Sequence, residues 1–221
     1  PPYGTTCCKW DTVIPLDEMW TQLHRVIKNT GVIVLFGSEP FSSSLRMSNI
    51  KNFKYDWIWE KDNGTGFLNA KRQPLKITET ISVFYSGQCN YVPQMRTGFK
   101  PYKITHGSKK TENYGNQPGA VSTSNGERYP LNLIKFCRDK NKLHPTQKPV
   151  ALLEYLIKTY TQENDVVLDF TMGSGSTAIA CLNTNRSFIG MEIEQNYFDI
   201  SYKRINEYIL ENNINTTLTK K

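Results

Sequence analysis

The fold is decided by the stretch Val166-Val167-Leu168-Asp169-Phe170-Thr171-Met172-Gly173-Ser174-Gly175-Ser176-Thr177. An apolar run ends at Asp169, small residues follow, and a second apolar run begins at Ala178. This order predicts a strand, a tight glycine loop and a helix. Glycine allows a ligand to approach the backbone, and the start of a helix presents unpaired N–H groups. A side chain at Gly175 is therefore expected to occupy the place of a ligand.

Glu192 ends the next predicted strand, about twenty residues after the glycines, where dinucleotide-binding folds place an acid that accepts hydrogen bonds from ribose hydroxyls. The loop lacks the third glycine of the G-x-G-x-x-G pattern. This difference disfavours a pyrophosphate ligand and favours an adenosyl group without phosphates. The alternative interpretation is an ordinary turn followed by a charge at the end of a strand.

Length and composition limit the class of protein. A chain of 221 residues suits a single domain, 1–221, that buries about 70% of its unfolded surface. Its five cysteines form no metal-binding spacing, and their odd number argues against a disulfide framework, so we predict no metal and a reduced, cytoplasmic setting. No apolar run approaches the ~20 residues that cross a bilayer, so no membrane partner is expected.

The positive charge is concentrated in one segment. Residues 94–142 carry ten basic and three acidic residues, an excess of +7 that equals the net charge of the whole chain. Backbone phosphates attract such a segment, and interleaved Asn, Gln and Arg can contact base edges, which predicts binding to double-stranded DNA. The alternative is a solvated loop whose lysines provide solubility. The candidate DNA-binding residues are Lys71, Arg72, Arg96, Lys100, Lys103, Lys109, Lys110 and Arg128.

Hydrophobic periodicity predicts the remaining elements. We expect helices over 15–29, 40–50, 150–160 and 195–212, and strands over 32–36, 53–60 and 81–85. A mobile, basic loop is expected over 61–78 and a frayed tail over 213–221. Because strands alternate with helices, the fold class is α/β, with a Rossmann-like, doubly wound and mostly parallel sheet.

Two further motifs point to a family. The chain opens with Pro1-Pro2-Tyr3-Gly4, and Asp-Pro-Pro-Tyr is the catalytic signature of amino-group DNA methyltransferases. The block His144-Pro145-Thr146-Gln147-Lys148-Pro149 is similar to the segment that precedes the cofactor strand in their β-class. The glycine loop and Glu192 follow in the β-class order. Over nearly its whole length the chain thus resembles β-class S-adenosylmethionine-dependent amino-DNA methyltransferases.

The resemblance implies a class I methyltransferase fold with an inserted target-recognition region. Within the single domain, 1–87 would be the catalytic half, 88–143 the insert and 144–212 the cofactor-binding half. The implied catalytic residues are Pro1, Pro2 and Tyr3. Those implied to bind S-adenosylmethionine are Thr146, Gln147, Lys148, Asp169, Phe170, Thr171, Gly173, Ser174, Gly175 and Glu192.

These residues imply a reaction on an exocyclic amino group of a flipped base. The carbonyl of Pro1 and the residue before it would accept hydrogen bonds from the amino group, while Tyr3 stacks on the base. Lys148 is expected to pair with the carboxylate of the cofactor. His144 is interpreted as a structural hydrogen-bonding residue, and Glu79 as a charge at a strand end outside the site.

Three alternatives remain open at this point. Adenine N6 is favoured over cytosine N4 as the target, and a non-catalytic DNA-binding module with a methyltransferase fold is the second class of function.

The family usually has Asp-Pro-Phe-x-Gly-x-Gly, whereas here the aromatic residue, Phe170, directly follows Asp169. The acidic or seryl residue expected before Pro1 is absent, and we expect the sequence to start inside a longer protein. A homodimer is left open.

Overall fold

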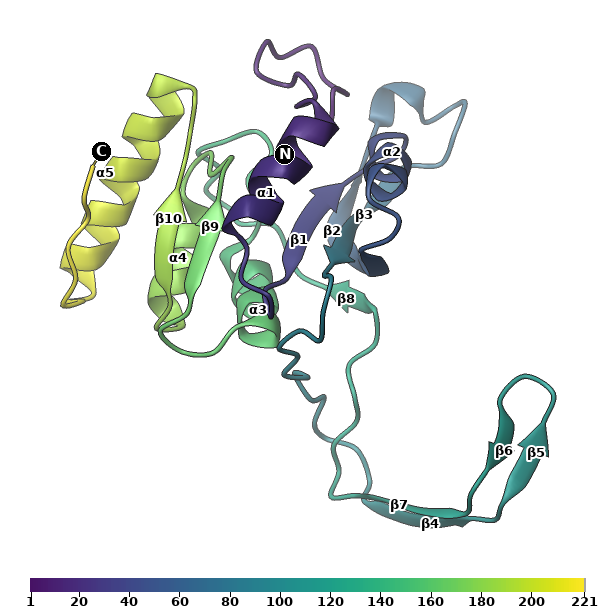
Figure 1. Ribbon diagram of the computed structural model, residues 1–221. Coiled ribbons are helices and arrows are strands. Elements are labelled where there is room, and N and C mark those ends of the chain that lie inside the picture. Colours follow the sequence, from purple (N-terminus) through teal and green to yellow (C-terminus); the bar gives the residue numbers. More distant parts are fainter. Residues whose placement is uncertain (221) are drawn as a thin grey trace. The chain divides into compact units, whose positions relative to one another are not determined.

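The computed structural model describes residues 1–220 and contains two compact units. The larger unit comprises Pro1–Val92 and the chain from Asn132 onward, and the smaller unit comprises Pro93–Leu131 (Figure 1). All the residues expected to form the catalytic and cofactor sites lie in the larger unit.

The larger unit contains a four-stranded sheet and a separate pair of strands. The order in the sheet is β1 (Ile33–Gly37), β3 (Lys76–Phe84), β2 (Phe53–Thr65) and β8 (Leu133–Lys135). Strand β3 is antiparallel to both of its neighbours, whereas β2 and β8 are parallel. The second sheet pairs β9 (Val166–Asp169) with β10 (Ser187–Gly190) in parallel.

These ladders do not confirm a doubly wound, mostly parallel sheet. Strand β3 follows β2 after residues 66–75 alone, and so short a connection permits an antiparallel pair, whereas a parallel pair needs a crossover of about a dozen residues or more. The bounds predicted for the loop, 61–78, are also wrong at both ends. Thr65 still pairs with Lys76, and a short 3₁₀-helix, Phe67–Asn69, lies between the strands.

Helices cover both faces of the four-stranded sheet. They are α1 (Leu16–Val26), α2 (Phe41–Ser48) and α3 (Val150–Tyr160). Ile33 and Leu35 of β1 pack with α1 and α2, while Val34 and Phe36 pack with the cluster that contains α3. Successive side chains of a strand point to opposite faces, so this alternation produces a layered α/β structure. Trp59 and Ile81, 1% and 0% exposed, fill the centre of the α3 side.

The predicted helices are confirmed, with small differences at their ends. Helix α4 (Ser176–Asn183) follows the glycine loop and packs against α3, and α5 (Gln195–Glu211) packs against α4. Within residues 1–220, none of the helices has the length and apolar character that a membrane span requires.

The expected frayed tail contacts α5 over its described part. Leu218 packs against the cluster formed by α4 and α5, and the Lys220 ammonium lies 4.8 Å from the centroid of the Phe198 ring. The tail therefore buries apolar surface although it forms no helix or strand. Lys221, which the expectation also included, lies outside the described residues.

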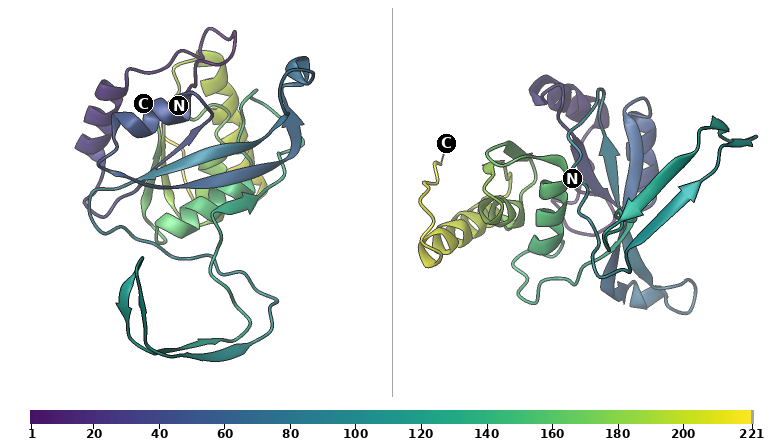
Figure 2. Two further views of the ribbon diagram at one scale, coloured as in Figure 1. Left: turned by 90° about the vertical axis from the view of Figure 1, so that its right-hand side faces the viewer. Right: turned by 90° about the horizontal axis from the view of Figure 1, so that it is seen from below.

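The smaller unit consists of two antiparallel ladders. Strand β4 (Tyr102–His106) pairs with β7 (Ala120–Ser124), and β5 (Lys109–Thr111) pairs with β6 (Gly115–Gln117). Figure 2 shows the two ladders following one another along one curved ribbon. The unit is shorter than the segment 88–143 expected as an insert, because β8 pairs with β2 in the sheet of the larger unit.

The packing of α3 on the sheet is expected to contribute strongly to stability. Leu152→Ala should lower the free energy of unfolding by about 2–5 kcal/mol, because Leu152 is 0% exposed and its removal leaves a cavity. Leu210→Ala is the control, because Leu210 lies on a helix with 76% exposure and should change the value by less than about 0.5 kcal/mol. Urea unfolding measures both, and equal losses would contradict the assignment of the core.

Candidate active site

The backbone that follows the Pro-Pro dipeptide is organised by Asp11. Its carboxylate accepts hydrogen bonds from the N–H groups of four successive residues, Tyr3, Gly4, Thr5 and Thr6, at 2.8–3.0 Å. Burial would raise the pKa of Asp11, but these hydrogen bonds lower it below its usual range. This role of Asp11 was not predicted from the sequence, because a lone aspartate eight residues from Tyr3 matches no motif.

The side chain of Tyr3 is held at its ring and at its hydroxyl. The ring stacks on Phe41 of α2, with centroids 5.3 Å apart and an interplanar angle of 24°. The hydroxyl donates a hydrogen bond to Glu79 Oε1 at 2.7 Å. Burial and the neighbouring negative charge of Glu79 raise the pKa of Tyr3 well above its ordinary value, so the phenol remains a donor at neutral pH.

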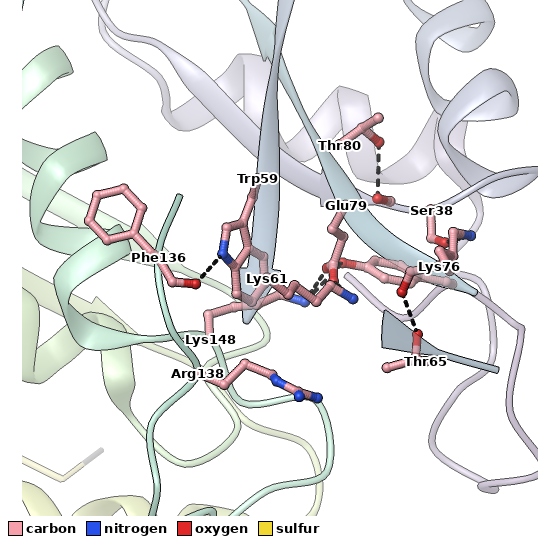
Figure 3. A network of polar contacts seen from close by, with 12 residues as sticks. Ser38, Trp59, Lys61, Thr65, Lys76, Glu79, Thr80, Phe136, Arg138 and Lys148 are labelled. Atoms are coloured by element: carbon pink, nitrogen blue, oxygen red, sulfur yellow. Dashed lines mark hydrogen bonds and ion pairs between the residues drawn. The ribbon is translucent and has the colours of Figure 1, made fainter. Parts of the chain in front are cut away.

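Glu79 lies between two ammonium groups. Lys148 donates to Oε1, and Lys61 Nζ lies 3.1 Å from Oε2. Figure 3 shows both lysines pointing toward Glu79, which reaches them from β3. We call Tyr3, Lys61, Glu79 and Lys148 the Glu79 cluster. The interpretation of Glu79 as a strand-end charge outside the site is corrected, because its carboxylate binds the hydroxyl of the candidate catalytic tyrosine.

The Glu79 cluster is largely removed from water. The side chains of Glu79, Lys61 and Lys148 are 9%, 12% and 19% exposed. Burial would raise the pKa of Glu79, but the two ammonium groups and the hydrogen bonds lower it below the ordinary value. Burial lowers the pKa of Lys148, and the charge of Glu79 partly offsets that effect. Lys148, expected to pair with a cofactor carboxylate, thus has a carboxylate partner within the chain.

The glycine loop joins the end of β9 to the start of α4. Gly173 and Gly175 both have left-handed backbones, with φ values of +52° and +76°. The N–H of Gly173 donates to Glu192 Oε2 at 2.8 Å, so Glu192 faces the loop. Asp169 Oδ2 accepts a hydrogen bond from the Thr177 hydroxyl at 2.6 Å, which ties the strand end to α4.

One expectation about the glycine loop is wrong. A Cβ at Gly175 would lie 3.1 Å from Ile205 and 3.2 Å from Ser201, both on α5, and therefore would not project into a ligand site. Gly175 is required by its left-handed backbone and by the close approach of α5. At Gly173 a Cβ would instead meet the ring of His144 at 3.5 Å.

The block that begins at His144 packs against this loop. Gln147 Oε1 accepts a hydrogen bond from the Ser174 hydroxyl at 2.9 Å. The ring of His144 lies 4.1 Å from that of Tyr197, and its Nδ1 accepts a hydrogen bond from the N–H of Thr146 at 3.2 Å. Burial lowers the pKa of His144. These contacts fit the interpretation of His144 as a structural residue.

Adjacent residues of the His144 block link Tyr3 to the glycine loop. Lys148 Nζ lies 3.2 Å from the Tyr3 hydroxyl oxygen, and Gln147 accepts a hydrogen bond from Ser174. Phe170 packs against the same apolar cluster as Tyr3, which includes α1 and α2. Thr171 donates its N–H to Asp169 Oδ1 at 3.1 Å. The structure thus brings together the Pro-Pro-Tyr segment, the His144 block and the glycine loop with Glu192.

The candidate DNA-binding residues are divided between the two units. Lys71 and Arg72 belong to the larger unit, and the other six belong to the smaller one. Arg96 and Arg128 contribute to the structure of the smaller unit, because their guanidinium groups lie 5.2 and 5.3 Å from the centroid of the Phe99 ring. The exposed lysines of its strands are Lys103, Lys109 and Lys110. Among the described residues, no group of His, Cys, Asp and Glu side chains is placed to hold a metal ion.

Comparison with known proteins identifies the family of the chain. A family model of N6/N4 DNA methylases matches residues 9–203. The type II methyltransferase M.BglII of Bacillus subtilis is 36% identical over 93% of this chain and 58% of its own length. The chain belongs to the N6/N4 DNA methylase family.

Two further proteins are similar over most of the chain. The DNA adenine methyltransferase YhdJ of Escherichia coli (strain K12) is 27% identical over 86% of this chain and 65% of its own length. A crystal structure of an M1.HpyAVI-SAM complex is 29% identical in sequence, with a TM-score of 0.61. The match covers 92% of this chain and 85% of the chain in that structure. The chain spans 58% and 65% of the lengths of the two curated relatives.

The ionisation of Glu79 should be visible in the pH dependence of stability. Because folding lowers the pKa of Glu79, its contribution is fully present above the unfolded pKa of about 4.3 and is lost as pH falls through the folded value. Glu79→Gln should therefore reduce the free energy of unfolding at pH 7, and the difference from the wild type should shrink below about pH 4.

Urea unfolding across this pH range measures the effect. Glu163→Gln is the matched control, because Glu163 is exposed, and its difference from the wild type should remain small throughout. A difference between Glu79→Gln and the wild type that does not change with pH would contradict the proposed ionisation.

Proposed function

We propose that this protein is a site-specific DNA methyltransferase that transfers a methyl group from S-adenosylmethionine to an exocyclic amino group of a flipped base. The observation that carries the proposal is that two adjacent residues contact both candidate sites. Lys148 Nζ lies 3.2 Å from the Tyr3 hydroxyl oxygen, and Gln147 accepts a hydrogen bond from Ser174 of the glycine loop at 2.9 Å. This supports a base-binding segment close to an adenosyl-binding loop, in a chain of the N6/N4 DNA methylase family.

The residues around the glycine loop fit S-adenosylmethionine. Both carboxylate oxygens of Glu192 accept hydrogen bonds from backbone N–H groups, those of Gly173 and Glu194. An acceptor at the end of this strand suits ribose hydroxyls. A loop with left-handed glycines at the start of α4 suits an adenosyl group that brings no phosphate. The name of the similar M1.HpyAVI-SAM complex supports the same cofactor. Bound there, it would supply an electrophilic methyl group.

The other residues proposed to hold the cofactor surround this loop. Gln147 bonds to Ser174, and Thr146 lies two residues from His144, whose ring covers Gly173. Asp169, Phe170 and Thr171 form the segment that connects β9 to the loop. Since Lys148 pairs with Glu79, we assign it to the support of Tyr3 and leave the cofactor carboxylate without a named partner.

The Pro-Pro-Tyr segment suits chemistry on an amino group. An exocyclic amine of adenine or cytosine is a weak nucleophile because its lone pair is delocalised into the ring. Carbonyl acceptors aimed at its hydrogens favour the form in which the lone pair points at the methyl donor, and proline offers a carbonyl without a competing N–H. The base must leave the duplex to reach them, and stacking on Tyr3 would return about 1–3 kcal/mol of that cost.

Adenine N6 is the proposed target. The name of the relative YhdJ, an adenine methyltransferase, supports adenine, whereas the family includes both N6 and N4 enzymes. Cytosine N4 is therefore the alternative product. A DNA-binding module without catalysis is the second class of function, and activity separates it from both.

Methyl transfer tests this proposal directly. The full chain should transfer tritiated methyl groups from S-adenosylmethionine to unmethylated genomic DNA, and nucleoside analysis should find the label in N6-methyladenine. Tyr3→Ala should reduce the rate at least about tenfold without changing cofactor affinity, because base stacking is removed while Gly173 and Glu192 are untouched.

Each of the other outcomes leads to a different conclusion about the function. N4-methylcytosine would establish the alternative target. Binding of both cofactor and DNA without transfer would favour the non-catalytic module. Label at C5 of cytosine would contradict the proposal, because that chemistry does not use an amino group.

A second test concerns DNA binding by the smaller unit. Lys109 and Lys110 are exposed on β5, and their joint replacement by alanine should weaken binding to all duplexes. The slope of log affinity against log salt concentration should become shallower by about 0.9 for each phosphate that is no longer neutralised. Joint replacement of Lys51 and Lys54, which are exposed in the larger unit, is the control.

Fluorescence anisotropy at several salt concentrations measures both double variants. Equal effects of the two pairs, or none, would remove Lys109 and Lys110 from the DNA-binding surface.

A further inference from the structure

The side chain of Tyr3 is restrained from three directions. Its backbone N–H is bound to Asp11 at 2.8 Å, one face of its ring stacks on Phe41, and its hydroxyl donates to Glu79 at 2.7 Å. A tyrosine side chain has two main torsions, and fixing both the ring plane and the polar end of the ring leaves one orientation. The hydroxyl contact is the one that determines where the far end of the ring lies.

Lys148 reinforces the hydroxyl without covering the ring. Its Nζ lies 3.2 Å from the Tyr3 hydroxyl oxygen but 5.3 Å from the ring centroid. The ammonium is therefore located toward the polar end of the ring. Since Phe41 occupies one face, a base that stacks on Tyr3 must use the opposite face.

Glu79 is itself held in place by the sheet. It pairs in register with Trp59 on β2, and Lys61 lies two residues further along β2, so it projects to the same face as Trp59. Lys61 binds Oε2 and Lys148 binds Oε1 of the carboxylate. With both oxygens engaged and 9% of its side chain exposed, the carboxylate has little freedom to rotate.

We propose that Glu79 is a positioning residue for methyl transfer, which fixes the hydroxyl of Tyr3 so that the ring presents one face to the flipped base. This inference rests on the proposed function. Glu79 does not contact the reacting amino group but acts through Tyr3. It gives a reason for a charged residue in a position where an apolar residue would cost less to bury.

The charges of the Glu79 cluster predict the order in which substitutions should lower kcat. Lys61→Met leaves the neutral pair of Glu79 and Lys148 and keeps the hydroxyl contact, so kcat should fall less than about threefold. Glu79→Ala leaves two facing ammonium groups and removes the acceptor of the Tyr3 hydroxyl. It should lower kcat on the order of tenfold to a hundredfold, the usual consequence of displacing a positioned group by about 1 Å. Glu79→Gln keeps an oxygen acceptor and should recover part of the rate.

The decisive experiment is a double-mutant cycle of Tyr3→Phe and Glu79→Ala in the full chain, with kcat measured on unmethylated genomic DNA. Tyr3→Phe removes only the hydroxyl, so it should fold normally and lower kcat by a factor similar to that of Glu79→Ala. In the Tyr3→Phe background, Glu79→Ala should lower kcat by less than about a further twofold, because both changes remove the same hydrogen bond. Affinity for S-adenosylmethionine, measured by calorimetry, should stay within about twofold in every variant that folds.

A control separates positioning from general destabilisation. Asp56→Asn breaks the ion pair of Asp56 with Arg46, 3.1 Å, on the same strand as Lys61 but away from Tyr3. It should lower stability and leave kcat unchanged. An equal loss of kcat in Asp56→Asn would show that any damage to this sheet reduces activity, and would overturn the proposal.

The outcomes distinguish this inference from the proposed function. If the wild-type chain transfers no methyl group, the function fails and the inference with it. If the wild type is active and Tyr3→Phe keeps the full kcat, the role of Glu79 is wrong while the function stands, even if Glu79→Ala does not fold. Independent, multiplicative losses in the cycle would also overturn the inference.

Discussion

A buried carboxylate must be paired, and in this protein that requirement connects distant parts of the chain. Removing a carboxylate from water costs several kcal/mol unless opposite charges and hydrogen bonds replace the solvent. Glu79 obtains them from Lys61 on β2, from Lys148 before α3 and from Tyr3 near the start of the chain. Each contact joins a different segment of the chain to Glu79, so the position of the Tyr3 hydroxyl depends on Glu79.

Two adjacent residues connect this cluster to the glycine loop. Lys148 binds Glu79, and its neighbour Gln147 binds Ser174 at 2.9 Å. The same short segment therefore contacts the support of Tyr3 and the loop that we propose for the adenosyl group. A displacement of this segment would move both partners of the reaction together, which explains how a block without an evident catalytic group contributes to the site.

Local patterns predicted the helices and the glycine loop, because hydrophobic periodicity and glycine conformation are local properties. They failed where long-range contacts decide. The antiparallel placement of β3 depends on the short connection after Thr65, which resembled a loop. Glu79 looked like a strand-end charge, because Lys148 lies 69 residues away in the sequence. Gly175 was assigned to a ligand contact, whereas its neighbours on α5, Ser201 and Ile205, are visible only in three dimensions.

The most direct test is a crystal structure of the full chain with S-adenosylhomocysteine and a duplex whose target base is extruded. The account predicts that the base stacks on the face of Tyr3 opposite Phe41, while the Tyr3 hydroxyl remains within hydrogen-bonding distance of Glu79. A base bound elsewhere, or a Tyr3 side chain released from Glu79 in the complex, would contradict it.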